Sequence, residues 1–562
     1  MTKKSLVLLV IIFLFGAVLR FYLLGSVPNG FHRDEVFLGY NAYSILKTGR
    51  DITGNLLPLH LASFLYTPAG YSYFSIPFIA LFGLSEFSVR FASAFFGAVT
   101  ILLIYFVSTL FYEKIFPQKS KNINTISLIS AFFLAISPWH INLSRTASVS
   151  TLVFFFIILG LFFFLKWVKI SKNVYLYLSY FSFFLSLLFY IASYSFLPLL
   201  IPVLYFVYYG DLKVKKLLFN IGLFGIFIIL PLGYTLISPN LSLRARTVGI
   251  TGGEIPKILS TQLIGEDGVS GTSPTVARFF HNKPVIYTNI FLGNYFQHFS
   301  YDFLFSDKGF PDRYRIPLSG LLYLFDLPLF ILGIITLAVS RKKYAYLLFA
   351  WIILAPIGSA LTFDDLPNLQ RTLFLVLPIV FINSFGVIWI WDNVSKNPML
   401  RRLVFALAAV FLFWCFIFYL HEYYIHGQLY RPWYRQNGYR ELVSRVSPLQ
   451  NNYKKIIVTN RESGPTLFFL FYLKYSPSNF QQETRSSAMR DFDRIGFGKY
   501  EFSEEECPLK EVLDKNGNAS LNGEKNTLYV NSGLCKILPG MTLLSTIKRA
   551  DGSKAFYIVE KK

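Results

Sequence analysis

Charged residues are scarce in this chain: they make up 15% of its 562 residues, against 54% hydrophobic and 19% aromatic residues. Alternating and amphipathic patterns are also rare, because the apolar residues come in long uninterrupted runs. This composition excludes an ordinary soluble domain. It predicts a mostly helical, polytopic membrane protein.

Cysteine is nearly absent, with three residues in the whole chain. Cys415 lies in an apolar run, whereas Cys507 and Cys535 lie in the more polar C-terminal part. The last two could form one disulfide or stay free, so cysteine usage does not decide the redox environment.

The apolar runs predict about eleven membrane spans, since a bilayer core of roughly 30 Å needs about 20 apolar residues in a helix. No small-residue cleavage site follows the first run, and Arg20-Phe21-Tyr22 continues it, so we interpret it as a span and not as a signal peptide. The predicted spans are Ser5–Leu24, Phe87–Tyr112, Ile123–His140, Val149–Trp167, Val174–Ala192, Ser195–Val207, Leu217–Ile237, Leu318–Val339, Tyr344–Leu361, Thr372–Trp391 and Leu403–Leu420.

The distribution of basic residues predicts the orientation. A formal net charge of +22 would suggest a nucleic-acid partner in a soluble protein, but here the lysines and arginines concentrate in every second short connection. Such connections mark the cytoplasmic side, so we expect no nucleic-acid partner, a cytoplasmic N-terminus and an extracytoplasmic C-terminal part in a multi-pass protein of the cell membrane. The basic residues include Lys3, Lys4, Lys114, Lys169, Lys213, Lys343, Arg401 and Arg402.

Two long outer connections, residues 25–86 and 238–317, are aromatic and contain Gly and Pro. Long loops of this kind often carry function. Thr67–Phe82 and Val285–Phe305 are apolar but interrupted, so we interpret them as interfacial or re-entrant helices. Counting either as a span would invert the basic-loop pattern that follows it.

The composition changes after Leu420, which predicts a transmembrane domain of residues 1–421 and an extracytoplasmic domain of residues 422–562. Strands are predicted over Lys454–Asn460, Thr527–Asn531 and Ala555–Glu560, and a helix over Pro465–Tyr475. This order is typical of a small α/β domain. Its sequence offers no candidate site.

Two adjacent carboxylates, Asp34 and Glu35, stand about ten residues beyond the first predicted span, in Phe31-His32-Arg33-Asp34-Glu35. They are either part of a solvated loop or the centre of chemistry at the outer surface. Glu86 and Arg90 lie four residues apart on a predicted helix, a spacing that favours a structural ion pair.

The chain resembles a known family at this point. Asp34-Glu35, then Leu84-Ser85-Glu86-Phe87-Ser88-Val89-Arg90, and four motifs downstream stand in an order similar to that of polyprenyl-phosphate-sugar-dependent glycosyltransferases with the GT-C fold, the protein O-mannosyltransferase (family 39) and aminoarabinose-transferase kind. The resemblance covers roughly residues 1–421. The downstream motifs are Ser137-Pro138-Trp139-His140-Ile141-Asn142-Leu143-Ser144-Arg145, His281-Asn282-Lys283, Gly320-Leu321-Leu322-Tyr323 and Pro367-Asn368-Leu369-Gln370-Arg371.

The resemblance implies transfer of a hexosyl or pentosyl group from a polyprenyl-phosphate donor to a protein, lipid or glycan acceptor at the outer face. Asp34 would be the general base, and Glu35 would position the acceptor or share a metal. Cations would bind the donor phosphate, and further residues would contact substrate. The expected phosphate ligands are Arg371, Arg145, Arg278 and Lys283, and the expected substrate contacts are His32, Arg33, Tyr323 and Asn368.

Metal dependence stays open. Several relatives carry a second acid a few residues after the position of Arg145, where this chain has Thr146-Ala147-Ser148, and some carry histidine where Asn368 stands. The outer histidines match no compact metal motif. No cofactor is therefore assigned, and a divalent metal remains an option.

Two other functions compete with the glycosyltransferase. A multi-pass transporter normally places ionisable or helix-breaking residues near mid-membrane, whereas these runs contain almost none and show no internal repeat. Asp326, in the outer half of a predicted span, is an exception that needs a partner, either a loop arginine or the donor. A non-catalytic envelope-assembly protein would leave the acidic first loop and the cationic second loop without a role.

Overall fold

The computed structural model describes the whole chain except residues 1, 63–66, 116–119, 212–216, 238–241, 244–246, 253, 310, 341–342, 395–396, 485–493 and 514–518. The chain forms two compact units. Unit 1 comprises Met1–Tyr22, Ser93–Ser144 and Ser148–Glu422, and unit 2 comprises Leu23–Ala92, Arg145–Ala147 and Tyr423–Lys562. The C-terminal part of the chain therefore forms one unit with the first long connection, while the predicted division after residue 421 stays a prediction.

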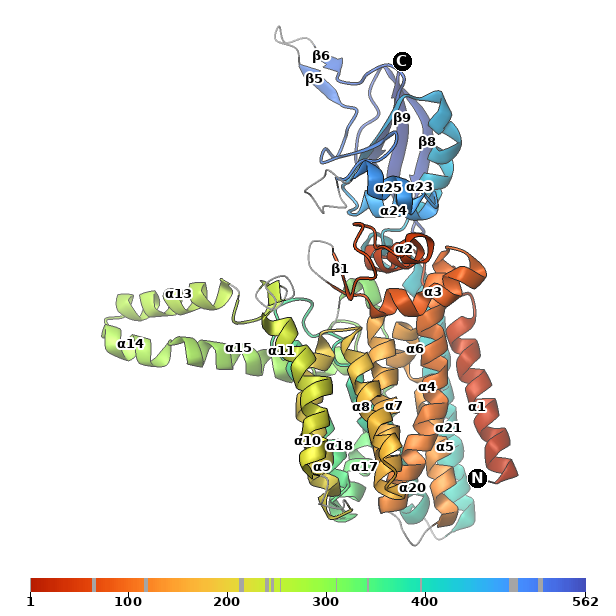
Figure 1. The fold of residues 1–562 in the computed structure, drawn as a ribbon, viewed down its shortest axis with the longest axis vertical. Helices are drawn as coiled ribbons and strands as arrows, with labels where there is room; N and C mark the ends of the chain where they lie inside the picture. The colour runs from red at the N-terminus through yellow and green to blue at the C-terminus, as the bar shows by residue number, and fades with distance from the viewer. Residues whose placement is uncertain are drawn as a thin grey trace. The chain divides into compact units, whose positions relative to one another are not determined.

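Unit 1 is a helical bundle (Figure 1). Among its described residues, seven helices are long and apolar enough to cross a membrane, or eight when a bent pair counts as one span, and three further predicted spans form shorter apolar helices. The prediction of a mostly helical, multi-pass membrane protein is confirmed. The helices are α1 (Lys3–Phe21), α4 (Glu86–Ile115, which begins in unit 2), α5 (Ser120–Ile136), α6 (Pro138–Ser144), α7 (Val149–Ile170), α8 (Asn173–Leu187), α9 (Ala192–Tyr208), α10 (Leu217–Phe224), α11 (Leu230–Ile237), α17 (Asp326–Ser340), α18 (Ala345–Leu354), α19 (Ile357–Ala360), α20 (Val376–Asn393) and α21 (Pro398–His421).

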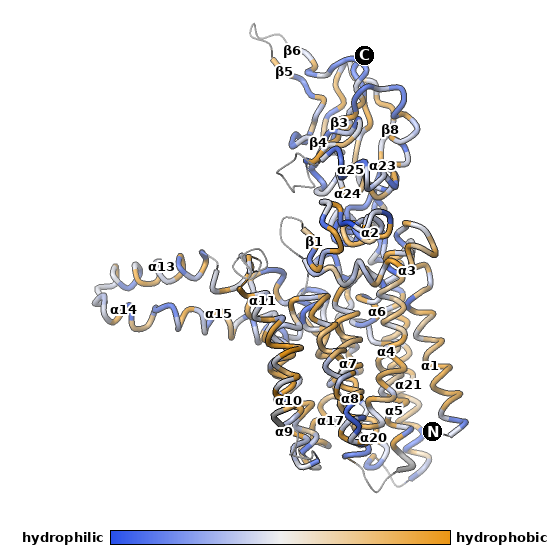
Figure 2. Tube along the Cα trace, viewed as in Figure 1, coloured by the Kyte–Doolittle hydropathy of each residue, from blue (hydrophilic) through white to orange (hydrophobic). Residues whose placement is uncertain are grey.

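Small residues let two of these helices approach closely. A Cβ on Gly333 of α17 would lie 2.0 Å from the Ile382 carbonyl oxygen of α20, and one on Gly386 of α20 would lie 2.2 Å from the Leu329 carbonyl oxygen. Backbone contact of this kind replaces the hydrophobic driving force that lipid cannot supply. The hydropathy of the residues shows long apolar stretches on α1, α5 and α10, as expected for helices that cross a membrane (Figure 2).

A buried arginine stabilises the bend between α5 and α6. The two helices meet at 55°, where Pro138 lacks an N–H and helical hydrogen bonding stops. Arg20 donates to the carbonyl oxygens of Leu134 and Ala135, both at 3.1 Å, and lies 2.8 Å from His140 Nδ1. The guanidinium thus satisfies carbonyl groups that the bend leaves exposed.

Three helices form an arm in unit 1: α13 (Ile255–Val269), α14 (Pro274–Phe280) and α15 (Lys283–Gln297). The arm runs across the direction of α7 and α10 (Figure 1). Its base is fixed by Asn294, which donates to Ala360 O at 3.2 Å, and by the Tyr295 hydroxyl, which donates to Ile353 O at 2.9 Å. An interfacial helix, which is one interpretation of Val285–Phe305, is expected to run across the membrane-spanning helices in this way.

Unit 2 combines the first long connection with a C-terminal α/β structure. The connection contains α2 (Arg33–Thr48), the short strands β1 (His60–Leu61) and β2 (Thr67–Pro68), and α3 (Gly70–Phe82). The C-terminal part contains α23 (Tyr439–Val446), α24 (Pro465–Tyr472) and α25 (Pro477–Glu483). Phe471 of α24 packs against Phe31, with ring centroids 5.1 Å apart.

A five-stranded mixed sheet has the order β4-β3-β7-β9-β8. Strand β3 (Lys455–Thr459) pairs in parallel with β4 (Tyr500–Ser503) and β7 (Thr527–Ser532), whereas β9 (Lys554–Lys561) pairs antiparallel with β7 and β8 (Met541–Lys548). The three predicted strands and the predicted helix are confirmed. Two short strands, β5 (Glu511–Leu513) and β6 (Ala519–Leu521), form a separate pair, and Cys507 is bonded to Cys535.

Candidate active site

The sequence at the start of α2 explains why a helix begins beside the acidic pair. His32 is the N-cap and its Nδ1 accepts the Asp34 N–H at 3.3 Å, while the Glu35 carboxylate accepts the His32 N–H at 3.2 Å. This reciprocal capping box satisfies N–H groups that have no partner inside the helix. Both acids lie in the first turn, where the helix dipole favours negative charge.

Glu35 is buried, and both of its carboxylate oxygens accept hydrogen bonds. Arg90 donates from Nε to Oε1 at 3.0 Å and from Nη2 to Oε2 at 3.1 Å, and the Ala147 N–H donates to Oε1 at 2.7 Å. A bidentate guanidinium pair is among the strongest contacts available to a buried carboxylate. Glu35 therefore connects three segments of unit 2 that are far apart in the sequence.

Arg90 is wholly buried and its five N–H groups all have acceptors. Besides the Glu35 oxygens these are the carbonyl oxygens of Leu24 at 3.3 Å, Pro28 at 3.0 Å and Gly30 at 2.6 Å. The predicted Glu86–Arg90 ion pair is wrong in its acid, because Glu86 accepts the Tyr472 hydroxyl at 2.6 Å instead. Helical spacing pointed to Glu86, but only Glu35 reaches the guanidinium in bidentate geometry.

Asp34 differs from its neighbour, since its side chain is 69% exposed. One carboxylate oxygen lies 3.3 Å from His32 Nδ1. The fixed Glu35 and the capped first turn therefore hold Asp34 at a defined position where a solvent-borne group can reach it. An exposed, oriented carboxylate is a geometry suited to accepting a proton.

The other expected residues of this unit contact the polypeptide. Arg33 donates from Nη1 to the Ser463 hydroxyl at 2.5 Å, and its N–H donates to Gln436 Oε1 at 3.1 Å. Arg145 is buried, donates to Val27 O at 3.0 Å and to the Tyr423 hydroxyl at 3.2 Å, and stacks over the ring of Tyr424. The C-terminal part of the chain thus supports the residues around Asp34.

Arg371 is the centre of a second group, in unit 1. Its side chain is 4% exposed, and it donates to the Thr362 hydroxyl at 2.5 Å, to Asp364 O at 2.8 Å and to Asp364 Oδ2 at 3.1 Å. Within the described part of the chain, its Nε is buried without a hydrogen-bond partner. A buried polar atom of this kind costs free energy unless a ligand or water satisfies it.

Asn368 shapes the turn that carries Arg371. Its side-chain oxygen accepts the N–H groups of Gln370 at 2.9 Å and Arg371 at 3.0 Å. Its own N–H donates to His298 Nε2 at 3.3 Å. The expected substrate contact is therefore a residue that fixes the backbone of the Arg371 turn.

His298 is one of the outer histidines that the sequence left as candidate metal ligands, and it accepts the Asn368 N–H beside Arg371. Its Nδ1 lies 2.9 Å from Asn294 O and its Nε2 lies 2.8 Å from the Ser359 hydroxyl. A carbonyl only accepts, so Nδ1 carries the proton and Nε2 accepts. Burial lowers the pKa of His298 to about 4, which keeps the ring neutral at pH 7.

Tyr323 is also committed to the structure of unit 1. Its hydroxyl donates to Ile136 O at 2.6 Å, and its N–H donates to Asp326 Oδ2 at 2.8 Å. Asp326 also accepts the Asn383 amide at 2.7 Å. Within the described part of the chain, Asp326 thus accepts hydrogen bonds from an amide and a backbone N–H and not from a loop arginine, which was one of its two expected partners.

Arg278 and Lys283 are exposed on the arm. Lys283 is the first residue of α15, and the 1.5 Å rise per residue puts it roughly 20 Å from the Gln297 end that adjoins His298. The structure does not bring these two cations together with Arg371. His281 lies between them in sequence and pairs with Asp267 at 3.1 Å.

This chain is similar to known proteins in its fold. No family model matches the chain, and no curated protein matches it. Among solved structures, ArnT from Cupriavidus metallidurans in the apo state has a TM-score of 0.51 at 11% identity, covering 98% of this chain and 97% of that one. ArnT bound to undecaprenyl phosphate has a TM-score of 0.50 at 12% identity, covering 99% and 98%.

The chain has the GT-C fold. An Archaeoglobus fulgidus oligosaccharyltransferase tethered to an acceptor peptide is also similar, with a TM-score of 0.49 at 14% identity, covering 84% of this chain and 63% of that one. The expected fold is thus confirmed over nearly the whole chain, including the C-terminal α/β part that the sequence resemblance did not cover. Fold alone does not fix the activity.

Proposed function

We propose that this protein transfers a sugar from a polyprenyl-phosphate donor to an acceptor hydroxyl or similar group at the outer face of the membrane. The observation that carries the proposal is the pairing of an exposed Asp34 with a locked Glu35 at the capped start of α2. Support for a lipid-linked donor comes from the full-length likeness to ArnT, which has been solved with undecaprenyl phosphate.

The chemistry needs a proton acceptor and a stabiliser of the leaving group. As the acceptor oxygen attacks the anomeric carbon, its proton passes to the Asp34 carboxylate. The bond between that carbon and the phosphate oxygen breaks, and its electron pair leaves with polyprenyl phosphate. General-base assistance of this kind contributes about 10²–10⁴-fold to the rate.

We assign Glu35 a positioning role, because its hydrogen bonds leave it occupied by Arg90, Ala147 and His32. It orients the first turn of α2 and thereby Asp34. His32 and Arg33 flank the carboxylate and would contact substrate beside it. Neither the sugar nor the acceptor, whether protein, lipid or glycan, is assigned.

Phosphate binding is proposed first for Arg371, whereas Arg145, Arg278 and Lys283 stay proposed phosphate ligands on the sequence resemblance alone. Arg371 supports the assignment best, because its guanidinium is buried and is held by Thr362 and Asp364. Among the described residues its Nε has no acceptor, so this N–H can donate to a phosphate oxygen. A planar guanidinium also matches phosphate geometry. A divalent metal remains an option for the reaction.

Donor use tests the proposal directly. The purified protein should consume a polyprenyl-phosphate sugar and release polyprenyl phosphate, and it should ignore soluble nucleotide sugars. Transfer from a nucleotide sugar without added lipid would contradict the assignment.

The orientation is tested separately. Reporter fusions after residues 120, 171, 214, 342 and 398 should report cytoplasm, and fusions after 60, 270 and 440 should report the outside. A cytoplasmic signal after residue 60 would put Asp34 on the wrong face.

A further inference from the structure

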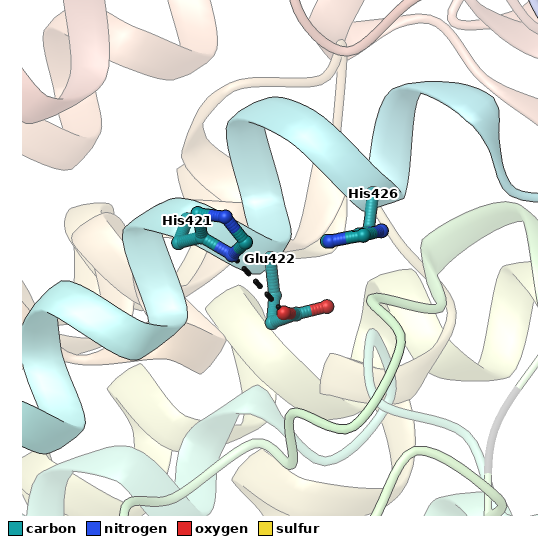
Figure 3. Close-up of side chains that lie close together, drawn as sticks. All are labelled: His421, Glu422 and His426. Atoms are coloured by element: carbon teal, nitrogen blue, oxygen red, sulfur yellow. Dashed lines mark hydrogen bonds and ion pairs between the residues drawn. The ribbon is translucent and has the colours of Figure 1, made fainter.

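The last membrane-spanning helix changes its winding where it ends. Helix α21 runs from Pro398 to His421 and continues without a break through a π-helical turn, Glu422–His426, into a short helix, Gly427–Leu429. His421, Glu422 and His426 gather on this segment, each with a ligand-type atom within 4.8 Å of the others (Figure 3). All three are close in sequence on one continuous helix, so local winding alone sets their spacing.

The π-turn is what brings the two histidines together. In an ideal α-helix, residues five apart point in directions about 140° apart, because each residue advances about 100°. A π-turn closes its hydrogen bonds from residue i to i+5 and so places residues five apart on nearly the same side. Such turns are rare and often occur at functional sites, which argues that the alignment of His421 with His426 has a use.

The donor set has the composition of a transition-metal site. Two imidazoles and one carboxylate are a ligand set of Zn²⁺, with water in the fourth position. His421 Nδ1 already lies 3.2 Å from Glu422 Oε1. Ligands of a tetrahedral zinc ion lie about 3.4 Å apart, given metal–ligand distances of about 2.1 Å, so small side-chain rotations convert a group spanning 4.8 Å into a coordination shell.

Burial also suits a bound cation. The Glu422 side chain is 6% exposed, whereas His421 is about half exposed. The carboxylate thus lies in the protein while the neighbouring imidazole reaches solvent, which leaves an entry path for the ion.

We propose that His421, Glu422 and His426 form a binding site for one divalent transition-metal ion of the zinc class, with water completing the coordination. The bound ion stabilises the π-turn at the outer end of the last span. The site is independent of the proposed glycosyl transfer and of the option of a metal there.

Metal binding is measured on the full-length protein purified in neutral detergent through a tag without histidine. After chelator treatment, Co²⁺ serves as an optical probe and Zn²⁺ as the competing ion. We expect one Co²⁺ per chain with the visible absorption of a low-symmetry four-coordinate site, displaced by Zn²⁺, and a higher melting temperature with Zn²⁺.

Three variants locate the ion. His421→Ala and His426→Ala should each weaken Zn²⁺ affinity by at least about tenfold, because losing a direct ligand costs no less than losing a residue that merely orients one. Glu422→Gln keeps the side-chain shape and should give the same loss in protein that elutes as the wild type does on size exclusion. The matched control is His281→Ala, which removes a histidine paired with Asp267 on the arm and should keep wild-type affinity.

Wild-type protein without a stoichiometric site would overturn the proposal. So would unchanged Zn²⁺ affinity in the His421 and His426 variants, or an equal loss in His281→Ala, since each result puts the ion elsewhere. If a histidine variant aggregates, the Glu422→Gln comparison decides by itself.

Discussion

The two groups of candidate site residues differ in how far their central side chains are exposed to solvent. In unit 2 the proposed general base, Asp34, is 69% exposed, and Glu35 and Arg90 beside it are buried. In unit 1 the proposed phosphate ligand, Arg371, is itself buried at 4% exposure. A proton acceptor has to meet a substrate hydroxyl, whereas a phosphate-binding guanidinium gains from a fixed, weakly solvated position.

The supporting contacts differ as well. Arg90 uses all five donors on Glu35 and three backbone carbonyl oxygens, so that pair is closed to ligands. Arg371 keeps an unpartnered Nε among the described residues. Arg90 therefore has no donor left for a ligand, whereas the Nε of Arg371 still has a hydrogen to donate. The variants below test both parts of this comparison.

The largest effect is expected from Asp34→Asn. The amide keeps the size of the side chain but removes proton acceptance, so turnover should fall by about two to four orders of magnitude while expression and donor binding persist. The measurement is steady-state turnover with polyprenyl-phosphate sugar. Asp302→Asn, at another exposed first-turn aspartate, is the control and should keep wild-type turnover. Wild-type turnover in folded Asp34→Asn would end the assignment of the base.

Arg90→Met should lower the stability of the folded protein, in addition to any effect on turnover. It leaves the Glu35 carboxylate buried without its cation, at a cost of about 3–5 kcal/mol. Thermal unfolding in detergent should therefore shift to clearly lower temperature. The double variant Arg90→Met with Glu35→Gln removes the stranded charge and should recover part of the loss. A double variant less stable than Arg90→Met would show that the charge pair is not the source of the effect.

Arg371→Ala should weaken donor use by about 10- to 150-fold, since hydrogen bonds to charged groups contribute about 1.5–3 kcal/mol. Arg371→Lys should restore only part, because an ammonium group cannot make the bidentate contact. KM for the donor, measured beside turnover, separates binding from chemistry. Lys257→Ala, an exposed arm cation paired with Glu254, serves as the control. Equal donor use by Arg371→Ala and wild type would return Arg371 to a purely structural role.

The smallest effect concerns pH. The pKa of His298 is lowered to about 4 in the folded protein, against about 6.5 when unfolded. The unfolded chain therefore binds the proton first, and the stabilising contribution of neutral His298 is complete above pH 6.5 and is lost as pH falls toward 4. The melting temperature should drop by a few degrees from pH 7 to pH 5, and His298→Gln should flatten this dependence. An identical pH profile in that variant would assign the effect to other groups.

Much of the fold was predictable, because hydrophobicity in a membrane protein is a local property. Runs of apolar residues marked the helices of unit 1, and β-rich segments marked β3, β7 and β9. The strands β4 and β8 were not predicted. β8 alternates exposed and buried residues weakly, and both strands owe their place in the sheet to partners elsewhere in the chain.

The sequence by itself determined that this is a multi-pass membrane protein and that an acidic pair follows the first span, because composition and position need no partner to be recognised. Only the tertiary structure decided which of the two acids is exposed. Glu35 is buried because Arg90, 55 residues away, and Ala147, 112 residues away, close around it, whereas Asp34 one residue earlier points to solvent. Contacts over such separations leave no periodic trace in the sequence. The grouping of His421 with His426 likewise depends on a π-turn, whose extra residue per turn changes which side chains share a face.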